Sequence, residues 1–187
     1  MKKLISICLG LIILIMMMTG CNISQSKDNI TINKLEDDNL TMGINYSVEN
    51  LDKGKYEIEY KAEEYEYGML VKEYDLLKTM VENKDNNLKL GINYDQPLEE
   101  DFINILIEDN TYESKSLDLL KAREEGIAMT TLNENKELEL NKPIVIAAYS
   151  IGGKGNTTSG LNIDKSEKIS NHNKNDLIIF LKIKKLS

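Results

Sequence analysis

The stretch Lys55-Tyr56-Glu57-Ile58-Glu59-Tyr60-Lys61-Ala62-Glu63 decides the fold. Apolar or aromatic residues stand at every second position of this stretch, and charged residues fill the positions between them. A period of two is typical of a β-strand with one buried and one solvated face, because successive side chains of a strand point to opposite sides. We therefore predict a strand here, with Tyr56 and Tyr60 in the core.

The residues after this stretch predict a β-hairpin. Tyr67-Gly68 is a turn signal, and Met69–Asp75 can return along the first strand as its partner. Apolar residues further along also fit one face of a helix, so a helix after Tyr74 stays open as an alternative: Leu70, Tyr74, Leu77 and Val81.

The rest of the chain predicts further short strands between polar turns. The segments are the alternation that starts at Ile30 and Ile32, then Leu88–Tyr94, Phe102–Glu108, Ile127–Leu132, Leu138–Leu140, Ile144–Tyr149 and Leu177–Ile183. Leu117–Glu125 reads as one short helix capped by Ser116 or as another strand. This series predicts an all-β fold with at most one short helix. We expect an antiparallel β-sandwich, immunoglobulin-like in architecture, with a barrel as the alternative.

The N-terminal residues have the pattern expected of an export signal. Met1-Lys2-Lys3 is positively charged, Leu4–Met18 is apolar, and Thr19-Gly20-Cys21 ends the segment with small residues and a cysteine. These residues resemble the lipobox signal of bacterial lipoproteins, with Met18 where leucine is usual. The resemblance implies cleavage between Gly20 and Cys21 and a diacylglyceryl group on the Cys21 sulfur. The alternative, an uncleaved membrane-spanning helix, needs about 20 apolar residues, and this run is shorter.

The export signal sets the domain boundaries that we predict. Residues 1–20 are the signal peptide, residues 21–38 are the lipidated N-terminus with a flexible polar tether, and residues 39–187 are a single β-sandwich domain. Cleavage leaves 187 − 20 = 167 residues and changes the net charge from −8 to −8 − 2 = −10. Such acidity argues against a nucleic-acid partner. In composition the chain resembles small, poorly characterised lipoproteins of AT-rich Gram-positive bacteria such as clostridia.

Motifs for chemistry are missing from the sequence. The resemblance implies that Cys21 is lipidated and that Cys8 is removed with the signal peptide, and a lone histidine, His172, cannot form a zinc site. The glycine-rich run Ile151–Gly160 contains Lys154, but its order differs from that of a phosphate-binding loop, which ends in Gly-Lys-Ser/Thr. We therefore predict no catalytic residue, no metal site and no cofactor.

These observations favour a binding module over an enzyme. We expect a non-enzymatic protein, lipid-anchored at the extracytoplasmic face of the cell membrane, that binds an envelope protein or a cell-wall glycan. Candidate surface residues are Tyr65 and Tyr67 at the hairpin tip and Lys154 in the glycine-rich run. The alternative is an envelope hydrolase with paired carboxylates, which only the abundance of acidic residues suggests. A two-lobed solute-binding protein is disfavoured, because the alternating βα pattern is missing.

Overall fold

The computed structural model describes residues 29–35, 43–93, 103–114, 117, 127–132, 135–151 and 175–186. All regular structure in these ranges is β-strand. The strands are β1 Thr31–Leu35, β2 Gly43–Glu49, β3 Gly54–Glu66, β4 Met69–Asn83, β5 Asn87–Asn93, β6 Asn104–Ile107, β7 Asn110–Glu113, β8 Ile127–Thr131, β9 Lys136–Glu137, β10 Ile144–Ile151 and β11 Asn175–Lys185.

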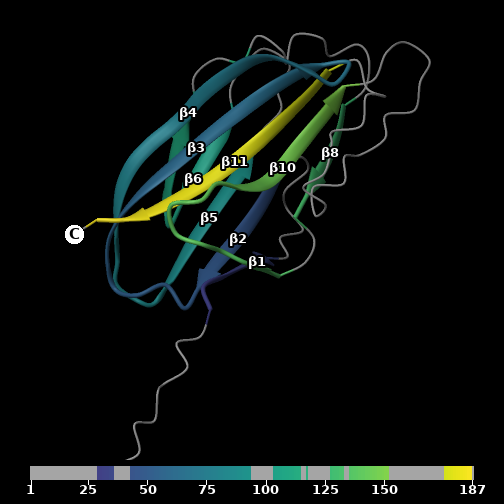
Figure 1. Cartoon of the computed structure of the whole chain (residues 1–187). Coiled ribbons are helices and arrows are strands. Elements are labelled where there is room, and N and C mark those ends of the chain that lie inside the picture. Colours follow the sequence, from purple (N-terminus) through teal and green to yellow (C-terminus); the bar gives the residue numbers. More distant parts are fainter. Residues whose placement is uncertain are drawn as a thin grey trace, which may run out of the picture.

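The strands form two antiparallel sheets that pack face to face (Figure 1). One sheet has six strands in the order β7-β6-β5-β2-β1-β9, and the other has five in the order β4-β3-β11-β10-β8. β3 alternates between buried apolar and less buried polar side chains and so turns one face to the other sheet, whereas β11 buries four residues in succession, Asp176–Ile179. The predicted β-sandwich is therefore confirmed.

The β3–β4 hairpin is the longest paired element of the fold. Its strands of 13 and 15 residues pair from Gly54↔Asn83 to Glu66↔Met69 around the turn at Tyr67-Gly68. The helical alternative after Tyr74 is wrong, since the whole segment continues as strand. Two shifts of register leave Leu76 and Val71 as extra residues in β4, which is an edge strand. Such bulges twist an edge and discourage pairing with other chains.

Two predicted boundaries need correction. The alternation that starts at Ile30 and Ile32 is, as predicted, a strand, β1 at Thr31–Leu35 with Ile32 fully buried, so the tether that we extended to residue 38 stops before Thr31. The strand expected at Leu138–Leu140 is observed as β9 at Lys136–Glu137, and the Leu138 N–H extends its pairing with the first sheet by donating to the carbonyl of Ile30 at 2.8 Å. Most of the predicted helix, residues 118–125, lies outside the described residues.

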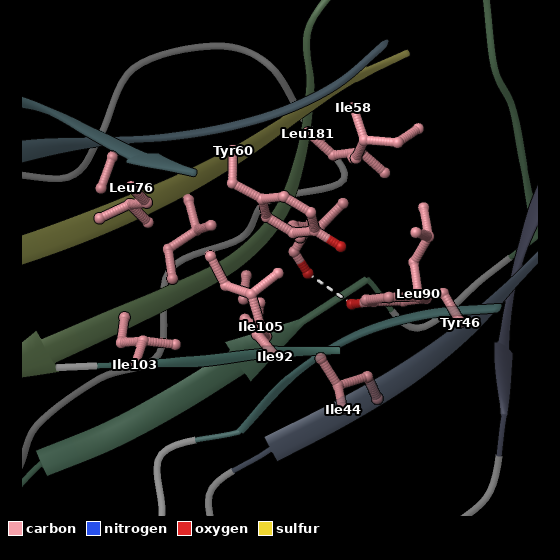
Figure 2. Close-up of a cluster of buried hydrophobic side chains, with 14 of the residues drawn as sticks. Ile44, Tyr46, Ile58, Tyr60, Leu76, Leu90, Ile92, Ile103, Ile105 and Leu181 are labelled. Atoms are coloured by element: carbon pink, nitrogen blue, oxygen red, sulfur yellow. Dashed lines mark hydrogen bonds between the residues drawn. The ribbon is translucent and has the colours of Figure 1, made fainter. Parts of the chain in front are cut away.

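Two tyrosines meet in the centre of the core. Tyr46 comes from β2 of the six-stranded sheet and Tyr60 from β3 of the other, both fully buried (Figure 2). The Tyr46 hydroxyl donates to the carbonyl oxygen of Ile146 in β10 at 2.5 Å and accepts from the Leu132 N–H at 3.3 Å. Tyr46 therefore joins the two sheets by hydrogen bonds as well as by packing.

The two ends of the sandwich differ. At one end, here called the proximal end, the chain enters at Asn29, whose carbonyl accepts from Asn50 Nδ2 at 3.1 Å. The short connection from β2 to β3 begins at Asn50, so β3 starts at this end with Gly54. The opposite or distal end holds the Tyr67-Gly68 turn. Other strand ends also lie at the distal end. They flank four segments of the chain: residues 36–42, 94–102, 118–126 and 152–174.

Candidate functional site

The distal hairpin turn has an unusual residue at its first position. Tyr67 and Gly68 both have positive φ angles, 47° and 79°, as a two-residue hairpin turn with the right twist requires. Asparagine and glycine tolerate this backbone best, and a bulky side chain there is strained. Asparagine occupies three of the other positive-φ positions among the described residues: Asn50, Asn86 and Asn141. Tyrosine at position 67 therefore makes the folded state less stable than asparagine would make it.

Apolar side chains gather at this turn. Tyr67 is 61% exposed, Met69 67%, Leu70 48% and Val71 48%. Val71 is the extra residue of a bulge that breaks the alternation of β4, and all five side chains from Met69 to Glu73 are exposed, the first three of them apolar. We call these four residues the distal patch.

Acidic residues surround the distal patch. Glu63, Glu64, Glu66 and Glu73 lie within this part of the hairpin, and Lys72 is the single basic residue between Glu63 and Glu73. Figure 1 shows the hairpin turn at one end of the long β3–β4 ribbon. The surface is therefore an apolar tip with a negative rim.

Side-chain hydrogen bonds stabilise the part of the hairpin next to the turn. Tyr65 donates to Glu63 Oε2 at 2.5 Å, and Tyr74 donates to Glu64 Oε2. Lys72 Nζ lies 4.5 Å from the ring centre of Tyr74, in cation–π geometry. Burial, with a further contribution from Glu63, raises the pKa of Tyr65 to about 12. The phenol is therefore neutral and remains a hydrogen-bond donor at physiological pH.

The predicted binding residues have different outcomes. Tyr67 is exposed, as we predicted, whereas Tyr65 is partly buried against the core and its hydroxyl is engaged by Glu63, so its exposure was predicted wrongly. Lys154 lies outside the described residues, as do Gly20 and Cys21. We did not predict Met69, Leu70 and Val71 as surface residues. The signal in the sequence was that three apolar residues follow one another. A strand with one buried face needs an apolar residue only at every second position.

Two acids of β3, Glu57 and Glu59, are paired with lysines. Glu57 lies 3.1 Å from Lys78 Nζ, and Glu59 lies 3.4 Å from Lys61 Nζ and 3.2 Å from Lys182 Nζ. Burial acts to raise the pKa of Glu59, but hydrogen bonds from Lys182 and Lys61 outweigh it and hold that pKa below its ordinary value. A glycosidase acid needs the opposite, a carboxyl with a raised pKa beside a second carboxylate. These acids do not form such a pair.

A polar row crosses the five-stranded sheet near its distal end. Asp176 of β11 stands in register between Tyr65 of β3 and Ser150 of β10, and Asp176 and Ser150 are each only 1% exposed. Ser150 Oγ has no hydrogen-bond partner within the described part of the chain. We did not predict this row from the sequence, where its only signal is one polar residue at the end of each of two apolar runs.

Among the described residues, no group of three or more His, Cys, Asp and Glu side chains is placed to hold a metal ion. No helix in the same ranges is long and apolar enough to cross a membrane.

Comparison with known proteins places the chain in a family. The model of the YgaN domain matches residues 39–185, which include β2 to β11. The chain belongs to the YgaN domain family. The match starts after β1. This strand of the YgaN domain, with its buried Ile32, therefore precedes the matched region. No curated protein and no solved structure matches the chain in the corresponding searches.

Proposed function

We propose that the protein is a lipid-anchored binding module at the extracytoplasmic face of the cell membrane, and that it presents its distal end to another component of the envelope. The lipobox at Gly20-Cys21 supports the anchor. Two acyl chains on Cys21 hold a protein on a bilayer far more durably than one chain does.

The arrangement of the two ends is the observation that carries the proposal. The eight residue steps from Cys21 to Asn29 span at most about 30 Å when fully extended. The chain then enters the domain at the proximal end. The 13 residues of β3 separate this end from the distal turn by about 40 Å. An anchor at Cys21 therefore attaches the domain by the end opposite the distal patch.

Acidic character is consistent with this orientation. The sequence without residues 1–20 carries a net charge of −8 − 2 = −10, so anionic lipid headgroups repel the domain. The tether and the charge together favour a domain that stands away from the bilayer with its distal end toward the envelope.

The anchor is tested by metabolic labelling with an alkyne fatty acid in cells that produce the native chain or a Cys21→Ser variant. We expect label on the native protein only, and membrane retention after a high-salt carbonate wash for the native protein only. A native chain without label, or a Cys21→Ser chain that stays in the washed membranes, would contradict lipid anchoring.

A further inference from the structure

We propose that the distal patch docks into an apolar recess rimmed by lysine and arginine on a different envelope protein. This inference deepens the proposed function and rests on it only for the compartment in which the partner is found.

Exposed apolar area is concentrated at the hairpin turn. Five large hydrophobic side chains among the described residues are strongly exposed, and four of them form the distal patch. The fifth, Met80, is 73% exposed and lies far along β4, opposite Glu57. Scattered apolar residues on a surface are ordinary, but a group at one rigid tip marks an interaction site.

The backbone of the turn is strained at its first residue. Tyr67 adopts a backbone with φ of 47°, which asparagine tolerates better. A bulky residue kept in such a conformation indicates that its side chain is used, since the turn itself would fold better without it. Large aromatic side chains are also the residues that dominate binding energy at interfaces.

The negative charge around the turn selects the partner. Four acids and one lysine give residues 63–73 a net charge of −3. Glu66 and Glu73 in this group are exposed. A second copy of the chain would place two such negative rims against each other, and an anionic bilayer would repel the same surface. A recess with a Lys and Arg rim is the complementary surface.

The geometry of β4 selects the mode of contact. An edge strand can add a strand from another protein, but the bulges at Val71 and Leu76 interrupt the ladder on this edge. The turn, in contrast, is held rigidly by the long β3 ladder and by the Tyr74–Glu64 hydrogen bond. The hairpin therefore binds by inserting its tip, and little ordering entropy is lost on binding.

The test uses two methionines of the same strand as a matched pair. A photo-cross-linking amino acid, benzoylphenylalanine, replaces Met69 in the distal patch or Met80 at a distance from it, in the otherwise native lipidated protein. Intact cells are irradiated, and cross-linked peptides are identified by mass spectrometry. We expect position 69 to capture one protein at a segment that combines apolar residues with lysine or arginine, and position 80 not to capture it.

Two further variants keep the test specific. Tyr67→Asn removes the ring while improving the fit of the turn, so its protein stays folded. Capture by position 69 should fall by about 30-fold in this variant, the loss typical of truncating a central interface residue. Charge reversal by Glu66→Lys together with Glu73→Lys should weaken capture as well, and thermal unfolding of each variant verifies that it is folded.

Several outcomes would overturn the inference. They are equal capture at positions 69 and 80, capture unchanged by Tyr67→Asn, a captured segment that is acidic, and cross-links to lipid, to a second copy or to residues 152–174 of the same chain, which contain four lysines. Fatty-acid labelling of the native chain, with Cys21→Ser as the unlabelled control, separates the two proposals. If the native chain lacks lipid, anchoring fails whatever position 69 captures; if it is lipidated and capture does not depend on Tyr67, the docking inference alone fails.

Discussion

The two tyrosines at the centre of the core should respond in opposite ways when their hydroxyl groups are removed. Tyr46 and Tyr60 are both fully buried, and Figure 2 shows their rings extending toward each other from opposite sheets. Replacement of either residue by phenylalanine keeps the ring and deletes one oxygen. The variants therefore differ in hydrogen bonding and hardly at all in packing.

Loss of the Tyr46 hydroxyl removes a hydrogen bond to Ile146 and a second one from the Leu132 N–H. The Leu132 N–H still donates to the Ile146 carbonyl at 3.1 Å, so neither backbone group is left without a partner. We expect Tyr46→Phe to lower the free energy of unfolding by about 1–1.5 kcal/mol, the net value of an ordinary hydrogen bond.

The Tyr60 hydroxyl has no hydrogen-bond partner among the described residues. Burial, followed by the proximity of Tyr46, raises the pKa of Tyr60, so the group stays neutral. A buried hydroxyl without a partner costs about 1–3 kcal/mol relative to its solvated state. We expect Tyr60→Phe to leave the free energy of unfolding unchanged or to raise it by up to about 2 kcal/mol, with an increase in Tm of about 2–4 °C per kcal/mol.

Urea unfolding followed by far-UV circular dichroism, on the chain without residues 1–21, measures both variants against the parent. Circular dichroism is preferable to fluorescence because the chain has no tryptophan and the substitutions remove tyrosines. The reasoning is refuted if Tyr60→Phe lowers the free energy of unfolding by 1 kcal/mol or more. That result would mean that a buried water or another group satisfies the hydroxyl.

Three other predictions concern the sheets and the turn. Gly91→Ala should lower the free energy of unfolding by about 1–3 kcal/mol, because the added Cβ would overlap Asn45 Oδ1 and lie 3.0 Å from a backbone oxygen. Urea unfolding measures this change, and an unchanged free energy of unfolding would show that Asn45 moves freely. Tyr67→Asn should raise the Tm slightly, by relief of the positive φ, and a clear decrease would contradict the strain at this turn. Glu59→Gln should cost less than about 1 kcal/mol at pH 7, since its lysine partners are partly exposed. Because the pKa of Glu59 is lowered in the folded protein, the difference in free energy of unfolding between variant and parent should be complete above pH 4.5 and should disappear as pH falls through the folded pKa. A difference that persists in acid would exclude the ion pairs as its cause.

The alternating pattern was sufficient to predict the sandwich. In β3 the alternation of Tyr56, Ile58 and Tyr60 with charged residues directly encodes which face is buried. The helical alternative for β4 arose because its bulges at Val71 and Leu76 disturb the period of two. Pairing with β3 decides the conformation there, and a single strand's sequence does not show its partner.

The candidate site was only partly accessible from the sequence. Exposure of Tyr67 followed from its place in a turn, but burial of Tyr65 depends on its neighbours in β11 and on Glu63, which only the folded register brings together. The opposite placement of the chain entry and the distal turn was also hidden, because it depends on the path of β2 and β3 between the two sheets.

The central claim is an anchored domain that binds through its distal end, and cross-linking from position 69 in intact cells with native Cys21 or with Cys21→Ser tests it most directly. We predict one dominant protein neighbour with the native anchor, lost or strongly reduced when Cys21→Ser releases the chain from the membrane. Equal capture from position 69 with native Cys21 and with Cys21→Ser, or capture of the same neighbour from position 80, would contradict the account.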